Sequence, residues 1–261
     1  MKYLFSFTLQ FFAPLLAGIA FYTCIPVPFS EKLAFQGVAR VAPLIGIFIG
    51  SLLSILENGL QLLGVPNLTR STLVIATWVG ITGGLHLDGV MDTADGLAVT
   101  DPQRRLVVMS DSHTGAFGAM AAVVVLLLKV VALSDISPDR EWTLILAAAW
   151  GRWGQLAAIV RYPYLKPTGK GAFHKTAIRS AWEALPTFFL LVGMGGVYGW
   201  VHPELWQRGV LLSGGGCVIA LATGAWFHHK LGGHTGDTYG AVVEWSEALL
   251  LCLMTIGSRL N

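Results

Sequence analysis

Long apolar runs separated by short polar segments set the pattern of this chain. Six runs approach the ~20 residues that a helix needs to cross the ~30 Å hydrocarbon core of a bilayer: residues 41–63, 114–133, 142–160, 185–201, 209–227 and 241–257. Residues 71–87 form another run that leads into an acidic motif, and residues 5–29 form one that prolines interrupt, so its crossing is left open. The pattern predicts an all-α, polytopic transmembrane helical bundle of about seven spans (six to eight), in one integral-membrane domain over residues 1–261.

The composition agrees with a membrane protein. Hydrophobic residues make up 54% of the chain and charged residues 12%, whereas soluble domains carry about 25% charged residues. The formal net charge is only +2 and no basic tract is present, which argues against nucleic-acid binding. The cysteines, Cys24, Cys217 and Cys252, lie in apolar segments without a CxxC pair and are interpreted as packing residues.

Besides the two glutamates of the last run, three charged residues lie inside apolar runs, where an unpaired charge is costly. Glu57 lies either near the headgroups or in the bundle interior. Lys129 is close enough to the end of its run that we expect its ammonium group to reach the interface. Arg152 either pairs with an acid on another helix or contacts a phosphate, and the sequence leaves both interpretations open.

The segment 83–118 carries five of the fifteen acidic residues. Asp88, Asp92 and Asp95 follow an i, i+4, i+7 spacing, so on a helix they project from one face. Like charges repel there, and Mg²⁺ would compensate them, since it prefers oxygen ligands and keeps waters that a phosphate can displace. We therefore predict that these residues bind Mg²⁺, with Asp111 contributing directly or through water. The competing interpretation is an acidic loop in solvent.

A second motif, LGGHTGDTYGAVVEWSE, covers residues 231–247. Asp237, Glu244 and Glu247 can share one helix face where an apolar run begins, which is an expensive place for carboxylates without a function. We predict that they complete the catalytic site. The alternative is an interfacial helix start, whose acids interact with the positive end of the helix dipole.

Positive charge is distributed unevenly between the two sets of loops. Residues 30–40, 88–113, 161–180 and 228–240 fall on one side and hold most of the Lys and Arg residues outside the spans. The opposite loops offer chiefly Arg140 and Arg208, with Arg70 at a boundary. Because positive loops favour the cytoplasm, we predict a multi-pass protein of the bacterial inner membrane whose active-site loops are cytoplasmic.

Carboxylates for Mg²⁺, cations for phosphate oxygens and glycine-rich turns together favour phosphoryl or nucleotidyl transfer. The histidines of these loops form no HExxH motif, and nothing near Ser112 forms a nucleophile elbow. The residues alone predict a Mg²⁺-dependent transferase that acts on a pyrophosphate at the cytoplasmic membrane face. They do not identify the substrate.

The motifs in combination resemble those of the cobalamin synthase family, the adenosylcobinamide-GDP ribazoletransferases. The resemblance covers nearly the whole chain, through CIPVP at 24–28, APLIG at 42–46, TGGLHLDGVMDTADG at 82–96, MSDSHTGAFG at 109–118, YPY at 162–164 and GGHTGDTYGAVVEWSE at 232–247. His113 and Lys166 stand where the family often has arginine. A lysine does not fully replace the two-pronged guanidinium group.

The resemblance implies Mg²⁺-dependent joining of adenosylcobinamide-GDP to alpha-ribazole or its 5′-phosphate in vitamin B12 biosynthesis. GMP would be released and adenosylcobalamin or its 5′-phosphate formed. Partners would be the two substrates and the lipid bilayer, without nucleic acid, and a homo-oligomer is left open. Two alternative functions belong to other classes of membrane protein. A CDP-alcohol phosphotransferase-like lipid enzyme should carry a DGxxAR pattern, which is missing after Asp88, and an ion or solute transporter should place charge near the bilayer middle.

These interpretations give each candidate residue a role. The catalytic groups are Asp88, Asp92, Asp237 and Glu244. The metal ligands are Asp88, Asp92, Asp95 and Asp111. The substrate-binding residues are polar and cationic side chains of the same loops and of one apolar run: His86, Ser112, His113, Arg152, Arg161, Lys166, Lys170, His234, Thr235 and Glu247.

Overall fold

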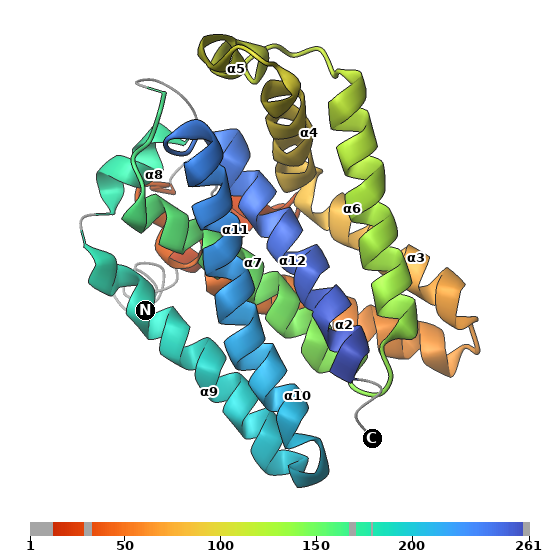
Figure 1. Cartoon of the computed structure of the whole chain (residues 1–261). Helices are drawn as coiled ribbons and strands as arrows, with labels where there is room; N and C mark the ends of the chain where they lie inside the picture. Colours follow the sequence, from red (N-terminus) through yellow and green to blue (C-terminus); the bar gives the residue numbers. More distant parts are fainter. Residues whose placement is uncertain (1–12, 29–32, 167–170, 179, 258–261) are drawn as a thin grey trace.

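The computed structural model describes residues 13–28, 33–166, 171–178 and 180–257, and over these the secondary structure is helical apart from one β-bridge between Tyr164 and His234. Six helices are long and apolar enough to cross a membrane, or up to seven if one bent pair forms a single span. The predicted all-α bundle is confirmed (Figure 1). The long helices are α2 (Ala42–Leu62), α6 (Ala116–Asp135), α7 (Arg140–Arg161), α9 (Leu185–Val201), α11 (Gly216–Leu231) and α12 (Gly236–Gly257).

The acidic motif has a helix of its own. The apolar run predicted over residues 71–87 is α3 (Asn67–Thr82), which ends at Gly83, and α4 (Leu85–Ala98) then leaves at an angle of 89°. Gly83 and Gly84 have φ angles of 61° and 69°, a left-handed conformation that glycine adopts without steric cost. The turn directs α4 across the end of the bundle, so the three aspartates lie on a helix as predicted.

Two other boundaries differ from the prediction. The C-terminal helix α12 begins at Gly236 rather than at residue 241, because GDTYG forms its first turn. The helix before it runs continuously over Pro203–Leu231, through α10 (Trp206–Val210) and the π-helical turn η5 (Leu211–Gly215). The prediction for residues 5–29 falls partly outside the described residues, and its described part holds a short helix, Ala13–Tyr22.

Glycines allow the spanning helices to approach closely, as small residues do in membrane bundles. On α2, a Cβ atom at Gly46 would lie 2.6 Å from the Cα atom of Ala149 on α7. A Cβ atom at Gly209 on α10 would lie 2.6 Å from the carbonyl oxygen of Gly195 on α9. The glycines therefore allow these helix pairs to pack backbone against backbone, and α7 runs through the centre of the bundle beside α12 (Figure 1).

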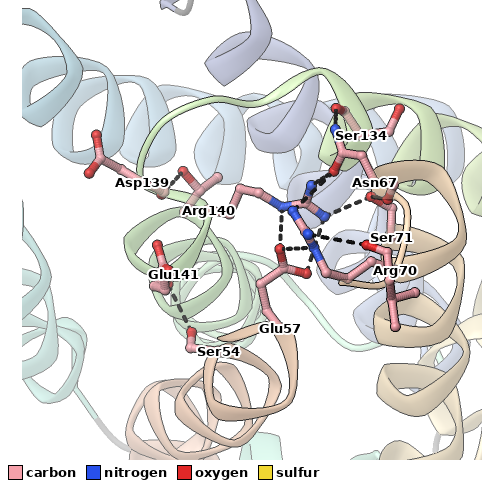
Figure 2. A network of polar contacts seen from close by, with 11 residues as sticks. Ser54, Glu57, Asn67, Arg70, Ser71, Ser134, Asp139, Arg140 and Glu141 are labelled. Atoms are coloured by element: carbon pink, nitrogen blue, oxygen red, sulfur yellow. Dashed lines mark hydrogen bonds and ion pairs between the residues drawn. The ribbon is translucent and has the colours of Figure 1, made fainter. Parts of the chain in front are cut away.

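A polar network joins the C-terminal half of α2 to the first turns of α3 and α7 (Figure 2). Glu57 is fully buried, and its carboxylate lies 2.6 Å from Nε of Arg70 and 2.8 Å from Nε of Arg140. Arg140 also donates from Nη2 to the hydroxyl of Ser71 at 2.7 Å, and from Nη1 to Asn67. Glu57 therefore points into the bundle rather than toward the headgroups.

The third basic residue that the sequence places on this side is also paired. Arg208 donates to a carboxylate oxygen of Asp139 at 3.2 Å and to the carbonyl oxygen of Pro138 at 2.9 Å. Arg70, Arg140 and Arg208 thus each have an acidic partner, so little net positive charge remains at this end of the bundle.

At the opposite end, α4 crosses α12 with almost no side chain between the two backbones. A Cβ atom at Gly89 would overlap the carbonyl oxygen of Asp237, and one at Gly240 would lie 3.1 Å from both Cα and the carbonyl oxygen of His86. Backbones approach this closely only where both helices carry glycine at the crossing. The crossing places the first turn of α12 directly against the acidic motif of α4.

We predict that Gly89→Ala lowers stability although alanine favours a helix by about 1 kcal/mol. Its methyl group would displace the first turn of α12, and inserting a methyl group into a packed contact costs roughly 1–3 kcal/mol. Thermal unfolding in detergent measures the effect. Gly80→Ala on α3 is the control, because a Cβ atom there meets nothing within 4 Å. Equal unfolding midpoints for the two variants would show that α12 can move away without cost.

Candidate functional site

A cavity of about 600 Å³ opens where α4 crosses α12. Its lining comes from the helix Ala13–Tyr22, α4, the turn at residues 109–112, α7, the first turn of α12, and four residues that follow α7: Tyr164, Lys166, Gly171 and His174. The acidic motif, the loop that carries Lys166 and the C-terminal motif therefore meet at one end of the bundle, as the charge pattern predicted. The cavity brings together these predicted site residues: His86, Asp88, Asp92, Asp111, Ser112, Lys166 and Asp237.

Carboxylates dominate the electrostatics of this cavity. Asp88 and Asp92 come from successive turns of α4, and Asp237 comes from the first turn of α12. The charges of Asp88, Asp237 and Lys166 all act on Asp92. Lys166 Nζ lies 3.0 Å from Oδ2 of Asp237, and it is the one Lys or Arg among the described lining residues. Acidic charge is therefore in excess.

The oxygen donors of the cavity fit Mg²⁺. In the described part of the chain no three His, Cys, Asp or Glu side chains converge closely enough to hold an ion by themselves. Mg²⁺ does not require such a set, because it commonly takes one or two carboxylates together with waters and substrate phosphates. Asp88 and Asp92 on one wall, with Asp237 on the other, supply that kind of partial ligand set.

The first turn of α12 is held by a reciprocal pair of hydrogen bonds. The N–H group of Thr235 donates to the hydroxyl of Thr238 at 2.8 Å, and the N–H group of Thr238 donates to the hydroxyl of Thr235 at 3.3 Å. The Thr235 hydroxyl also donates to Oδ2 of Asp237 at 3.2 Å. Thr235 is fully buried, so it positions Asp237 and does not line the cavity as a substrate contact.

His234 connects this turn to the loop after α7. Its backbone N–H donates to the carbonyl oxygen of Pro163 at 2.9 Å and its carbonyl accepts from the N–H of Leu165 at 2.8 Å. The imidazole lies 3.1 Å from both the Thr238 hydroxyl and the carbonyl oxygen of Gly224, and burial lowers its pKa to about 4. This neutral, enclosed ring organises the loop that carries Lys166, and it is not among the lining residues that meet a substrate.

Asp95 points away from the cavity although it shares the face of Asp88 and Asp92. Its two carboxylate oxygens accept from the N–H groups of Gly115 at 2.7 Å and Gly118 at 2.8 Å, where α6 begins. A carboxylate at a helix N-terminus satisfies donors that have no partner within the helix. The predicted metal-binding role does not agree with this placement, because the last turn of α4 has already passed the cavity and reached α6.

Asp111 and Ser112 lie on the exposed rim, and His113 lies just outside it. His113 Nδ1 lies 2.6 Å from Oδ1 of Asp111. This contact lowers the pKa of the Asp111 carboxyl and raises the pKa of His113. His113 therefore reaches the cavity only through its contact with Asp111 and does not line the cavity itself.

Glu244 and Glu247 lie in the bundle interior and not in the cavity, which differs from their prediction as catalytic and substrate-binding groups. Lys129 Nζ lies 2.6 Å from Glu244 and 2.5 Å from Glu247, and Arg152 Nη1 lies 2.8 Å from the other oxygen of Glu247. All four side chains are at most 4% exposed. Of the two interpretations of Arg152, the ion pair with another helix is the one present.

The prediction that Lys129 reaches the interface is wrong. Its ammonium group is buried between two carboxylates and 4.6 Å from the centre of the Trp78 ring. Two acids and two bases balance within this ion-pair cluster, so it needs no external counter-ion. Glu244 and Glu247 do share a face with Asp237, but they lie about 10 and 15 Å further along α12, which takes them below the cavity.

Arg161, which the sequence predicts to bind substrate, does not line the cavity. Arg161 is exposed at the end of α7, where its guanidinium carbon lies 5.9 Å from the Tyr162 ring. Lys170 lies outside the described residues.

Several lining residues have no counterpart in the sequence-based assignment. They are mainly aromatic or uncharged polar: Phe21, Tyr22, Gln155, Tyr164, His174 and Tyr239. Burial lowers the pKa of His174 to about 4, so it is neutral at pH 7. Tyr164 and Tyr239 lie inside the motifs YPY and GDTYG. The sequence-based assignment missed them because it considered mainly the charged residues of these motifs. Both ring nitrogens of His86 are buried without a hydrogen-bond partner in the described part of the chain, which suits contact with a ligand.

The family of cobalamin-5-phosphate synthases has a model that matches residues 14–255, which is most of this chain and includes every wall of the cavity. The chain belongs to the cobalamin-5-phosphate synthase family. This membership confirms the resemblance that the motifs indicated.

Relatives in this family are similar over nearly their whole length. A protein of Trichormus variabilis is 58% identical over 242 residues, covering 93% of this chain and 96% of its own. One of Synechocystis sp. is 49% identical, covering 90% and 91%, and one of Desulforamulus reducens is 36% identical, covering 96% and 99%. Each is named adenosylcobinamide-GDP ribazoletransferase. No solved structure matches the chain.

We predict that the ion-pair cluster of Lys129, Arg152, Glu244 and Glu247 stabilises the folded protein. Glu247→Gln leaves Lys129 and Arg152 with one carboxylate between them, and breaking a buried ion pair costs about 3–5 kcal/mol. We expect a lower unfolding midpoint in detergent and less folded protein in the membrane. Glu204→Gln is the control, since that side chain is 68% exposed.

A second variant tests the cause. Arg152→Met added to Glu247→Gln removes the cation that lost its partner, and should recover part of the stability. A Glu247→Gln variant with the wild-type unfolding midpoint but no catalytic activity would instead support the catalytic role that the sequence suggested.

Proposed function

We propose that the chain joins adenosylcobinamide-GDP to alpha-ribazole, or to alpha-ribazole 5′-phosphate, in vitamin B12 biosynthesis. The observation that carries this proposal is the carboxylate-rich cavity in a chain 58% identical to a relative of that name over 93% of its length. The products are GMP and adenosylcobalamin or its 5′-phosphate.

The reaction exchanges one phosphorus–oxygen bond for another. A hydroxyl oxygen of the ribazole sugar attacks the phosphorus attached to the cobinamide side of the diphosphate. The bond from that phosphorus to the bridging oxygen breaks, and GMP leaves with the bridging oxygen. The proton of the attacking hydroxyl passes to a carboxylate of the cavity and then to solvent or to GMP. A base within hydrogen-bond reach of the hydroxyl promotes this step.

The residues of the cavity suit separate parts of this task. Asp88, Asp92 and Asp237 would hold Mg²⁺, which supplies positive charge beside the diphosphate oxygens. Lys166, which Asp237 orients at 3.0 Å, would bind a phosphate oxygen from the opposite side. The remaining carboxylate oxygens are the candidates to accept the hydroxyl proton.

The size of the cavity suggests which parts of the substrates enter it and which part stays outside. A volume of about 600 Å³ suits a nucleoside together with a diphosphate. The corrin ring of the cobinamide would then remain at the mouth, beside the exposed rim of Asp111 and Ser112. Uncharged walls such as Tyr164 and neutral His174 suit a sugar and an aromatic base.

We also propose that the cavity faces the cytoplasm from a bacterial inner membrane. The basic residues at the other end, Arg70, Arg140 and Arg208, are all paired with acids. At the cavity end Arg104, Arg161 and Lys230 are exposed. Exposed Lys and Arg side chains therefore lie mainly at the cavity end, which favours this orientation.

Removal of single carboxylates tests the catalytic assignment. We expect Asp88→Asn and Asp92→Asn each to lower GMP release from adenosylcobinamide-GDP at least a hundredfold, or roughly 2.7 kcal/mol of transition-state stabilisation. The matched control is Asp135→Asn at the far end of α6. Stabilisation of the protein against heat by Mg²⁺ alone should also weaken in both variants. Turnover within threefold of the wild type in both would contradict the assignment.

Cysteine labelling tests the orientation. In a chain without Cys24, Cys217 and Cys252, single cysteines at the exposed positions Gln103 and His229 should react with a membrane-impermeant reagent only from the cytoplasmic side. Cysteines at the exposed positions Leu63 and Glu204 should react only from the other side. Opposite labelling of Gln103 and His229 would refute the single-face arrangement, and reversal of all four would refute the orientation.

A further inference from the structure

A second cavity lies on the other side of α4, between α4, α6, α11 and α12. It has a volume of about 530 Å³, and its lining is apolar except for two threonines. The residues that matter here are Val90, Ala94, Leu97, Val218, Trp226 and Leu249. We call it the apolar groove. It is separate from the catalytic cavity, because α4 lies between them and presents Asp88 and Asp92 to the latter.

The apolar groove opens on the surface that the bilayer would cover. Its lining residues Val218, Trp226 and Leu249 are 66%, 49% and 41% exposed. They belong to helices long and apolar enough to cross a membrane. Val218 and Trp226 are eight residues apart on α11, so the groove runs for about 12 Å along that helix. An apolar groove of this length on the lipid-facing surface suits part of an acyl chain.

Two basic side chains stand at the end of the groove nearest the catalytic cavity. Lys230 Nζ lies 5.7 Å from the centre of the Trp226 ring, and Lys230 is exposed. Arg105 donates from Nη1 to the carbonyl oxygen of Lys230 at 3.1 Å and from Nε to that of Val99 at 3.2 Å. Arg105 therefore fixes the end of α4 against the end of α11 and lies beside Lys230, whose ammonium group stands over the Trp226 ring.

A comparison within the same molecule separates this groove from the general lipid-facing surface. A second apolar hollow of about 420 Å³ lies between α6 and α12 and includes Leu127, Val131 and Cys252. The charged residue in its lining is Asp135, and its described lining holds no Lys or Arg. A negatively charged headgroup is favoured at the apolar groove and disfavoured at this hollow.

We propose that the apolar groove binds an anionic glycerophospholipid of the bilayer. One acyl chain lies between α4 and α11, and the phosphate lies between Lys230 and Arg105. The acyl chain gains little from leaving lipid that is equally apolar, so the selectivity comes from the headgroup charge. Lysine and arginine at a membrane surface each favour anionic lipid, and two of them predict a preference of roughly thirtyfold over a zwitterionic lipid. The acyl chain fills the space on the side of α4 opposite Asp88 and Asp92.

The test uses the purified full chain in detergent. Native mass spectrometry measures the dissociation constants of phosphatidylglycerol and phosphatidylcholine with identical acyl chains. We expect phosphatidylglycerol to bind about thirtyfold more tightly, and Lys230→Gln to reduce this preference to about fivefold. Lys230 makes no contact with the catalytic cavity, so this variant should keep the wild-type GMP release.

A pair of filling variants locates the lipid. Ala222→Trp places an indole in the apolar groove and should weaken binding of phosphatidylglycerol at least fivefold, whereas Leu127→Trp in the second hollow should not. Equal affinities for the two lipids, or an unchanged preference in Lys230→Gln, would overturn the proposal. A dimer that Ala222→Trp dissociates would also overturn it, because a second copy of the chain would then occupy the groove.

Discussion

The close contact between the backbones of α4 and α12 is the constraint on which the cavity lined by Asp88, Asp92 and Asp237 depends. Gly89 and Gly240 face the other helix where any side chain would collide with backbone atoms, so the helices cross at a distance that only glycine permits. That distance sets Asp88 and Asp92 opposite Asp237, on two segments separated by more than half of the chain. The left-handed glycines before α4 then turn the helix so that its acidic face meets this crossing.

The other charges of the bundle hold the helices that surround the crossing. The pairing of Lys129 with Glu244 and Glu247 joins α6 to α12, and Asp95 fastens the beginning of α6 to α4. Charges in the middle of the spans are enclosed and balanced, which limits the large cost of ions in an apolar medium. Charges at the helix ends remain open to ligands. The same residue types therefore stabilise the bundle at one depth and line the cavity at another.

The sequence predicted correctly those features that depend only on the spacing of residues along the chain. Run length identified the spans, and helical spacing placed the aspartates of α4 on one face. Spacing does not show how deep in the bundle a side chain lies. Asp237 and Glu247 share a face of α12, yet Asp237 lines the cavity and Glu247 lies in the core. The partner of a buried charge was also hidden, because Lys129 lies 118 positions from Glu247. The aromatic walls escaped notice because tyrosines within a charged motif carry no separate signal.

Charge balance gives a further reason to expect a divalent cation in the cavity. Four lining carboxylates, those of Asp88, Asp92, Asp111 and Asp237, face one lysine, Lys166, and leave a formal charge of −3 when the histidines are neutral. A diphosphate substrate is itself an anion, and close to such a surface it is repelled at every distance within the ~8 Å screening length of physiological salt. Lys166 already compensates Asp237 at 3.0 Å and cannot offset the others. The proposed Mg²⁺ would offset this charge when the diphosphate binds, and a hard divalent ion with oxygen ligands suits these carboxylates.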